Sequence, residues 1–503
     1  MWVNEMDMIY ELQNGTDIRG IAYENNNKKV NLTVNEVKRI AESFYLWLKN
    51  KKKKDIITIS VGCDSRITGE GFRNTFIKTI EYLGGNVIDC KMATTPAMFM
   101  TTVMDNYNCD GAVMITASHL PYYYNGIKFF TSEGGLEKSD IKEILDISCV
   151  DKKLFGKSAN GKITTKNLID DYSKLLVDKI RNEINSSVNY NEPLKGLKII
   201  VDAGNGAGGF YAEKVLYQLG ADITGSQFLI PDGMFPNHIP NPENKEAMES
   251  ICSAVIKNKS DLGIIFDTDV DRAAIVDKNG KPINKNSLIA LISSIILEEN
   301  PNTYIVTDSI TSDGLSKFIN ELNGKHYRFK RGYKNVINEA IRLNNEGKEC
   351  HLAIETSGHA ALKENYFLDD GAYLISKILI KVAKLYEQGK SIEELICNLE
   401  QAKEEKEVRI GIEEKEYKEY ANVLLEDLKK YIEGVPYWSE VVNNYEGIRV
   451  KCGEENGDGW FLIRLSLHEP LLALNIESNS IGGCEKIYNN LKMFLKDYKL
   501  KGI

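Results

Sequence analysis

The chain has 503 residues, of which 43% are hydrophobic and 27% charged, and its formal net charge is -9 at pH 7. At roughly 100 to 200 residues per domain, this length predicts three or four domains. Nucleic acids and anionic membranes usually bind a basic face, which the negative balance argues against. We therefore expect neither of these partners, and any anionic ligand must be met by a local group of Arg and Lys side chains.

The cysteines and the N-terminal segment indicate the cellular compartment in which we expect the protein. The nine cysteines are scattered, odd in number and without a C-x-x-C pair, which predicts neither a disulfide framework nor a zinc knuckle. The segment MWVNEMDMIYELQNG is acidic where a secretory signal would be basic, and no apolar run approaches the ~18 residues that span a bilayer. We expect a soluble protein of the reducing cytoplasm.

Strand-like runs alternate with helical periodicity along the chain. One helix is predicted over residues 33–49, because Thr33 and Glu36 have the spacing of a capping box. Its apolar face is formed by Val37, Ile40, Ala41, Phe44 and Leu48. The lysines at 51–54 suit the solvated end of that helix. Five β-branched-rich runs are predicted strands: 55–62, 111–117, 197–203, 261–267 and 303–308.

Domain boundaries are marked only by changes in composition. Polar, turn-forming or charge-rich segments occur at 150–165, 280–282 and 399–410. They predict four domains at residues 1–160, 161–282, 283–400 and 401–503, the first three of them α/β and the last one smaller.

The motif FDTDVDR sets three carboxylates, Asp267, Asp269 and Asp271, directly after an apolar strand. Crowded like charges favour a compensating cation, and an all-oxygen ligand set is typical of Mg²⁺. An EF-hand is excluded, because Arg272 and Lys278 occupy the positions where that loop needs Gly and Glu. Two alternatives stay open: a solvated acidic turn, and the D-x-D nucleophile of haloacid-dehalogenase-type enzymes.

Three glycines in VDAGNGAGG, Gly204, Gly206 and Gly209, have G-x-G-x-x-G spacing between a strand and the predicted helix FYAEKVLYQLG. The spacing fits a dinucleotide site, with Asp222 at a plausible distance for a ribose contact. It fits equally a turn in which glycine permits tight packing. The sequence leaves this choice open.

Other motifs place reactive or anion-binding side chains beside predicted strands. MITASHLPYYYNGIKF presents Ser118 and His119 just after an apolar run, where a strand can position a loop. Glu355, Ser357 and His359 offer the mixture of acceptors and donors that sugar hydroxyls require. Near the C-terminus, arginines with adjacent hydroxyl and imidazole groups suit a phosphate dianion, namely Arg449, Arg464, Ser466 and His468.

Taken together and in this order, the motifs resemble the α-D-phosphohexomutase family. The matching segments are TDIRG, GCDSR, TASHLPYYYNGIK, VDAGNGAG, PDGMFPNHIPNPE, DTDVDR, ETSGH and RLSLHEP. The resemblance implies a four-domain, heart-shaped architecture with three similar α/β domains containing mixed sheets and a smaller α+β C-terminal domain. One loop from each domain would meet in a central cleft.

The resemblance also implies roles for individual residues. Ser118 would be the phosphoserine and would bind Mg²⁺ together with Asp267, Asp269 and Asp271. The residues around the transferring phosphoryl group would be His119, Lys128, Arg19 and Arg272. The substrate-binding residues would be Gly332, Tyr333, Lys334, Glu355, Ser357, His359, Arg464, Ser466 and His468. Departures from the family pattern occur at Leu120, Thr268, Tyr333, Leu467, His468 and Asn475.

The implied reaction is the interconversion of hexose 1-phosphate and hexose 6-phosphate, with mannose and/or glucose as the sugar. It would proceed through the phosphoserine and a hexose 1,6-bisphosphate, which would also act as activator. The alternatives are a phosphoglucosamine mutase, a sugar-phosphate phosphatase, and a non-catalytic sugar-phosphate-binding protein. The expected partner is a small-molecule sugar phosphate, and the sequence indicates neither the preferred sugar nor the oligomeric state.

Overall fold

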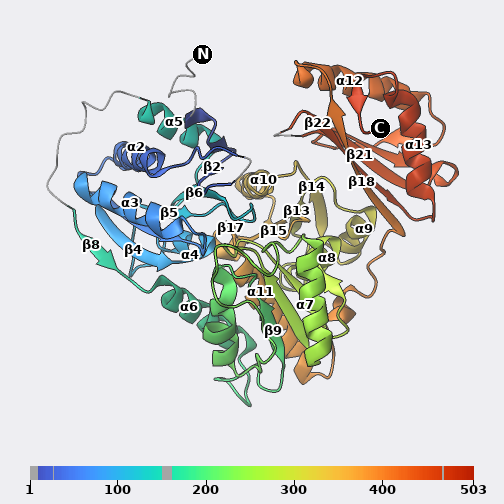
Figure 1. Ribbon diagram of the computed structural model, residues 1–503. Coiled ribbons are helices and arrows are strands. Elements are labelled where there is room, and N and C mark those ends of the chain that lie inside the picture. Colours follow the sequence, from blue (N-terminus) through green and yellow to red (C-terminus); the bar gives the residue numbers. More distant parts are fainter. Residues whose placement is uncertain (1–8, 26–27, 150–160, 467–468) are drawn as a thin grey trace. The chain divides into compact units, whose positions relative to one another are not determined.

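The computed structural model describes residues 9–25, 28–149, 161–466 and 469–503 (Figure 1). The chain forms two compact units. The first contains the residues up to Asn284 together with Ser357–Glu394, and the second contains Lys285–Thr356 and the residues from Leu395 onward. Within the described ranges, no helix has the length and apolar character needed to cross a membrane.

The first unit begins with a mixed sheet of order β1-β2-β6-β5-β3-β4-β8, with β7 paired to β6. Its strands are β1 (Gln13–Asn14), β2 (Asp17–Ile21), β3 (Thr58–Cys63), β4 (Asn86–Met92), β5 (Gly111–Ile115), β6 (Tyr124–Thr131), β7 (Gly134–Gly135) and β8 (Ile163–Thr165). β3 pairs in parallel with β4 and β5, whereas β6 is antiparallel to β5 and β2. The β5–β6 connection therefore starts at the carboxyl end of the buried strand β5, and the chain then runs back beside β5 as β6.

Helices of this part are α2 (Val34–Lys52), α3 (Gly69–Tyr82), α4 (Thr95–Met100) and α5 (Lys138–Ser148). The predicted helix is confirmed in α2, because both hydrogen bonds of the Thr33–Glu36 capping box form and the five predicted apolar residues are buried. Helix α2 packs against α3 and α5 (Figure 1). The helix ends among its lysines, with Lys53 as a left-handed C-cap, as expected of a solvated terminus.

A second, smaller sheet of the first unit has the order β12-β11-β10-β9. Its strands are β9 (Ile199–Asp202), β10 (Leu262–Phe266), β11 (Ala273–Asp277) and β12 (Pro282–Ile283). Helix α7 (Lys245–Asn258) buries Ile251 and Val255 against it. Because β10 is buried along its whole length and is followed directly by β11, the acidic motif between them is held between two paired strands.

The remaining elements of the first unit are α6 (Leu168–Ile184), α11 (Gly371–Glu387), η2 (Ala207–Gly209), η3 (Tyr211–Leu216), η4 (Tyr217–Leu219), η5 (Lys363–Asn365), β16 (Ala360–Leu362) and β17 (Leu368–Asp369). The helix predicted after the glycine motif differs in type, because η3 is a π-helix flanked by 3-10 turns. Such a widened turn is an established form of local irregularity near functional sites. η3 packs against α6 and β9.

The second unit starts with three parallel strands in the order β14-β13-β15. They are β13 (Tyr304–Thr307), β14 (Lys325–Arg328) and β15 (Cys350–Ile354), and the helices among them are α8 (Lys285–Glu299), α9 (Asp313–Glu321) and α10 (Tyr333–Asn345). α10 packs against β13 and β15, and α9 packs against β14. β15 ends immediately before Glu355, so this acid lies at a carboxyl strand end.

The C-terminal part of the second unit is an antiparallel sheet of order β19-β20-β21-β22-β18-β23. The strands are β18 (Glu404–Ile412), β19 (Trp438–Glu440), β20 (Ile448–Cys452), β21 (Gly459–Leu465), β22 (Leu471–Ser478) and β23 (Leu500–Lys501). Helices α12 (Tyr417–Glu433) and α13 (Gly483–Leu495) share one hydrophobic core with it. The predicted fold class, α/β parts with mixed sheets followed by an α+β C-terminal part, is confirmed.

The five predicted strands all form, but each is shorter than its apolar run. The run at 55–62 becomes β3 only from Thr58, and the run at 197–203 becomes β9 only from Ile199. The length of a strand depends on the neighbouring segments that pair with it and pack on it, and not on its own apolar run alone.

Candidate active site

The side chain of Ser118 is held in the loop between β5 and β6. Its Oγ lies 3.3 Å from Asp267 Oδ2 and 3.2 Å from Nδ1 of His119. The backbone of Ser118 has φ +52, and its N–H donates to Thr116 Oγ1 at 2.9 Å. A non-glycine residue in the left-handed region is uncommon, so the loop holds this hydroxyl in a conformation that the surrounding contacts must enforce.

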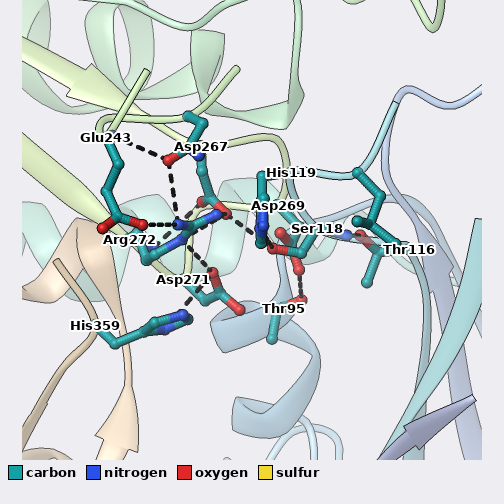
Figure 2. A network of polar contacts seen from close by, with 12 residues as sticks. Thr95, Thr116, Ser118, His119, Glu243, Asp267, Asp269, Asp271, Arg272 and His359 are labelled. Atoms are coloured by element: carbon teal, nitrogen blue, oxygen red, sulfur yellow. Dashed lines mark hydrogen bonds and ion pairs between the residues drawn. The ribbon is translucent and has the colours of Figure 1, made fainter. Parts of the chain in front are cut away.

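The three aspartates of the β10–β11 connection, Asp267, Asp269 and Asp271, lie together and are fully buried. Each offers one carboxylate oxygen to a cluster in which these atoms lie within 4.8 Å of one another. Figure 2 shows Asp267 and Asp269 beside the Ser118 side chain. Thr95 binds Asp269 twice, through its hydroxyl to the carboxylate and through its N–H to the carbonyl oxygen.

Two cations neutralise part of this negative charge. Lys128 Nζ lies 2.5 Å from Asp271 Oδ2 and 3.4 Å from Asp269 Oδ2. The Arg272 guanidinium lies 3.3 Å from Asp267 Oδ2, and Figure 2 shows it between that carboxylate and Glu243. Lys128 and Arg272 are themselves buried, so these attractions act with little screening by water.

Burial, together with the charges of Asp271 and Asp269, raises the pKa of Asp267 well above its usual range. Burial also opposes ionisation of Asp271, but the positive charges of Lys128, His359 and Arg272 outweigh it and lower the pKa of that carboxyl. Without a further cation, the cluster therefore favours a proton on one of its acids.

A divalent ion fits this cluster. Oδ1 of Asp269 and Oδ1 of Asp271 are buried and accept no hydrogen bond. Buried carboxylate oxygens are normally paired, and unpaired oxygens on an all-oxygen set are what a hard cation such as Mg²⁺ would use. His359, which precedes β16, and Asp369, on β17, form a second group of possible ligands with Asp271.

Two of the three predicted histidines, His119 and His359, lie at this cluster. Burial, with Arg272 and Arg19 nearby, lowers the pKa of His119 to about 2. For His359, burial alone would lower the pKa, but the charges of Asp369 and Asp271 raise it above its usual value. Arg19 lies on β2 and donates to Asp17 Oδ2 at 2.8 Å. Ser357 is buried, and its Oγ has no hydrogen-bond partner.

The second unit brings together another group of predicted residues. The N–H of Gly332 donates to Glu355 Oε1 at 2.6 Å. Gly332 has φ +113 and precedes α10, whose first residues are Tyr333 and Lys334. A left-handed φ is easily adopted only by glycine, so this residue type fixes how the loop meets the acid.

Arg464, at the end of β21, is buried and lies 3.6 Å from Glu446 Oε1. The other oxygen of Glu446 accepts from Ser309 Oγ at 2.5 Å and from the N–H of Arg331 at 3.1 Å. The N–H of Ser466 donates to Leu471 O at 2.9 Å. The predicted substrate residue His468 lies outside the described residues, as does Leu467.

Comparisons with known proteins show the family of the chain. Three models of the phosphoglucomutase/phosphomannomutase family match the chain, α/β/α domain I at residues 11–153, domain II at 174–280 and domain III at 284–402. Phosphoglucosamine mutase of a Sulfurovum species is 31% identical over 76% of this chain and 84% of its own. The chain belongs to the α-D-phosphohexomutase family.

Further relatives extend the likeness over almost the whole chain. Phosphoglucomutase of Neisseria gonorrhoeae is 29% identical over 88% of this chain and 90% of its own. The crystal structure of a phosphoglucomutase/phosphomannomutase family protein from Burkholderia thailandensis matches with a TM-score of 0.78 and 23% identity, and covers 99% of this chain and 98% of that one. The predicted family resemblance is confirmed, and the chain is a phosphohexomutase.

In this phosphohexomutase the glycine motif serves close packing. A Cβ on Gly206 would lie 2.7 Å from Thr268 O, and a Cβ on Gly209 would lie 2.1 Å from Leu229 O. Protein backbone thus fills the space that a dinucleotide phosphate would need. Asp222 is exposed and accepts from Thr224 N–H at 2.9 Å within its own turn. The packing alternative accounts for the motif.

Arg449, considered above as a phosphate ligand, is used differently by the phosphohexomutase fold. It is 1% exposed, and its guanidinium donates to Ser309 O at 2.9 Å and Thr311 O at 3.0 Å. Its other face lies 3.5 Å from the ring centroid of Trp460. The interpretation as a phosphate ligand was wrong, because β20 buries this side chain among backbone carbonyls.

Several residues at the site escaped the sequence analysis. Thr95 binds Asp269, and Asp369 pairs with His359. Asn241 and Glu243 both contact Arg272, at 3.1 and 3.5 Å. The motif PDGMFPNHIPNPE contains the last two, but its polar composition alone gave no sign of which side chain they would meet.

Proposed function

We propose that this phosphohexomutase is a phosphoglucomutase/phosphomannomutase that interconverts hexose 1-phosphate and hexose 6-phosphate through phosphorylated Ser118. The observation that carries the proposal is the 3.3 Å approach of Ser118 Oγ to Asp267 Oδ2, within a buried set of three carboxylates. A serine at this position gains a phosphoryl group only if the added charge of about -1.5 to -2 is balanced nearby.

In the proposed reaction, the phosphorus–oxygen bond to Ser118 breaks as a new bond forms to a free hydroxyl of the sugar phosphate. The proton of the sugar hydroxyl passes to a neighbouring base, Ser118 Oγ takes up a proton as it leaves, and the product is a hexose 1,6-bisphosphate. The bisphosphate then turns over, and its other phosphoryl group returns to Ser118 Oγ as the serine hydroxyl gives up its proton. The sugar oxygen left behind takes up a proton and becomes a hydroxyl, so the enzyme regains its starting state.

The chain's own cations would stabilise the transferring group. Arg272 and Lys128 are fixed by carboxylates, so their charges need no reorganisation when negative charge moves between oxygens. Asp267, Asp269 and Asp271 with Ser118 would hold Mg²⁺, which when bound draws negative charge from the phosphoryl oxygens. Arg19 adds a further positive charge near His119.

Three groups are candidates for accepting the hydroxyl proton. His119 lies 3.2 Å from Ser118 Oγ through its Nδ1. His359 is held by Asp369, and Lys128 is bonded to Asp271. Variants of each would separate these candidates by the pH dependence of kcat.

Substrate recognition would use the predicted substrate-binding residues of both units. Glu355, Ser357 and His359 would bind the sugar hydroxyls, and Gly332, Tyr333 and Lys334 would face the ligand. Arg464 and Ser466, with His468, would bind the phosphate distant from the reacting centre. The 3- and 4-hydroxyls are the same in glucose and mannose, so we expect turnover of both sugars.

The central test is Ser118→Ala beside Ser132→Ala, an exposed serine in the turn after β6. We expect Ser118→Ala to abolish interconversion of glucose 1- and 6-phosphate while keeping the thermal midpoint, because the nucleophile is lost but the loop is not. Ser132→Ala should behave as wild type. Mass spectrometry after incubation with glucose 1,6-bisphosphate should find phosphate on Ser118, and near-normal turnover of Ser118→Ala would refute the proposal.

The preferred sugar is tested with a panel of glucose, mannose and glucosamine 1-phosphates, each assayed with its 1,6-bisphosphate. The 31% identity to a phosphoglucosamine mutase makes that activity the second candidate. A kcat/KM highest for glucosamine 1-phosphate would favour it over the glucose and mannose assignment. Release of inorganic phosphate without formation of a 6-phosphate would identify a phosphatase instead.

A further inference from the structure

Arg66, in the GCDSR motif, is the centre of an unusual set of contacts. Its guanidinium is fully buried and donates four hydrogen bonds, all to backbone carbonyls of the loop that begins at Ser118. The acceptors are the carbonyl oxygens of Ser118, of Leu120 at 2.6 Å, of Pro121 at 2.9 Å and of Tyr124 at 2.9 Å. Each terminal nitrogen thus donates to two carbonyls.

The third nitrogen of Arg66 faces Asp64, with Nε 3.3 Å from Asp64 Oδ2. The position of Asp64 is fixed in turn, because its N–H donates to Ile115 O and its Oδ1 accepts from the N–H of Arg66. The guanidinium is therefore anchored on β5, the strand that leads into the nucleophile loop. A planar group with five donors suits several fixed acceptors better than a single ammonium nitrogen does.

The loop needs such an anchor because it is irregular and strained at Ser118. Within residues 118–124, Ser118 has φ +52, and the carbonyls of Ser118, Leu120, Pro121 and Tyr124 all turn toward one guanidinium. Buried carbonyls without partners are costly, so the arginine stabilises this conformation specifically. Ser118 Oγ owes its place beside Asp267 to the course of this loop.

A second segment closes over the arginine. The ring of Phe235 lies 5.3 Å from the Arg66 guanidinium carbon, and Phe235 has φ +50. Gly233 approaches so closely that an added Cβ would lie 2.5 Å from Ile67 N and 2.6 Å from Ser65 O. The motif PDGMFPNHIPNPE thus packs its first half directly on the segment that carries Arg66.

The other half of that motif contacts Arg272, the cation beside Asp267. Asn237 donates to Asn205 Oδ1 at 2.7 Å, and Asn241 Oδ1 accepts from Arg272 Nη1 at 3.1 Å. Glu243 lies 3.5 Å from the same guanidinium. Residues 231–243 therefore contact the anchor of the nucleophile loop at one end and the cation beside Asp267 at the other.

We propose that Arg66 is a positioning residue for phosphoryl transfer, which holds the loop 118–124, and that residues 231–243 set its spacing from the carboxylates. The inference rests on the proposed function of Ser118. Arg66 touches no reacting atom, and it acts through the backbone. Because misplacing a reacting group by about 1 Å can cost about 100-fold in rate, loss of this anchor lowers kcat more than it alters substrate affinity.

The test compares Arg66→Lys with Arg73→Lys in the full-length protein. Arg73 is a matched control, because it too is largely buried and pairs with an aspartate, Nε lying 3.3 Å from Asp89 Oδ1, while its described partners lie outside the nucleophile loop. A lysine at 66 keeps the charge but cannot reach four carbonyls. We expect kcat to fall about 100-fold with KM little changed, and amide hydrogen exchange in 118–124 to accelerate, whereas Arg73→Lys leaves all three near wild type.

The exchange measurement separates this inference from the proposed function. Absence of mutase activity in the wild-type protein would refute the proposed function, while exchange would still report whether Arg66 holds the loop. A folded Arg66→Lys with the kcat and exchange of Arg73→Lys would overturn the inference. If Arg66→Lys does not fold, Phe235→Leu decides, with a severalfold lower kcat and faster exchange in 118–124 expected, and wild-type values of both overturning the proposal.

Discussion

The two groups of predicted site residues balance their charges in different ways. Around Ser118, three buried acids face two cations, Lys128 and Arg272, so one acid favours a proton unless a further cation is bound. Around Arg464, a single acid, Glu446, lies 3.6 Å from the guanidinium and also accepts from Ser309 and Arg331. The first group is arranged for a bound cation. The second holds an arginine beside an acid, and in the proposed function a substrate phosphate would take the place of that acid.

This difference predicts that variants around Ser118 change mainly kcat and that variants around Arg464 change mainly KM. Charges fixed around a reacting oxygen act in the transition state and change kcat. An arginine that exchanges Glu446 for a substrate phosphate contributes to binding in the ground state and the transition state alike, and therefore changes KM. Variants in the two groups test whether this division is real.

The largest effect is expected for Asp269→Asn. The change removes one negative charge from the carboxylate set and weakens the bond from Thr95, so we expect kcat to fall about 100-fold or more and half-maximal activity to need more Mg²⁺. The measurement is a Mg²⁺ titration of mutase activity. Asp105→Asn, at an exposed position, serves as control. An unaltered titration curve would show that this loop does not bind the metal.

A smaller effect is expected for Arg464→Gln, and it should be on KM rather than on kcat. Charge-assisted contacts to phosphate contribute about 1.5–3 kcal/mol, so KM for the sugar phosphate should rise about 10- to 100-fold while kcat changes less. Arg409→Gln is the control, since that side chain is 67% exposed. A fall in kcat at constant KM would contradict the division between the two groups.

The smallest effect concerns stability at Glu477, a buried acid on β22 that accepts from Trp460 Nε1 at 2.8 Å. Burial raises its pKa to about 7, so the folded protein binds a proton there more readily than the unfolded chain does. The resulting stabilisation is complete below about pH 4.5 and is lost as pH rises through 7, with a slope of at most about 1.4 kcal/mol per pH unit.

Glu477→Gln should remove that slope, because glutamine keeps the acceptor for Trp460 but does not ionise. In thermal unfolding between pH 5 and 8, the stability of the variant relative to that of the wild type should increase as pH rises. Glu455→Gln, on an exposed turn, should keep the wild-type dependence. Parallel curves for Glu477→Gln and the wild type would mean that Glu477 does not titrate in this range.

The elements that the sequence predicted correctly depend on interactions close in the chain. The capping box of Thr33 and Glu36 forms within one turn of α2, and alternating burial follows from the apolar positions of that helix. The spacing of Asp267, Asp269 and Asp271 directly after β10 is likewise local, and it was enough to predict a carboxylate cluster. Family motifs, rather than periodicity, predicted that Ser118 belongs with them.

Contacts between segments that are distant in the chain could be read only from the tertiary structure. From the sequence, Arg449 was proposed as a phosphate ligand and Arg66 was given no role of its own, yet Arg449 is stacked on Trp460 and Arg66 holds the carbonyls of the loop that begins at Ser118. The glycines after β9 could have received a phosphate, and instead they admit the backbone at Thr268 and Leu229. The local sequence pattern determines the backbone conformation of a residue and the face of the helix or strand on which it lies. Which group its side chain contacts depends on how distant segments pack. Only this packing distinguished the structural arginines from the candidate ligands.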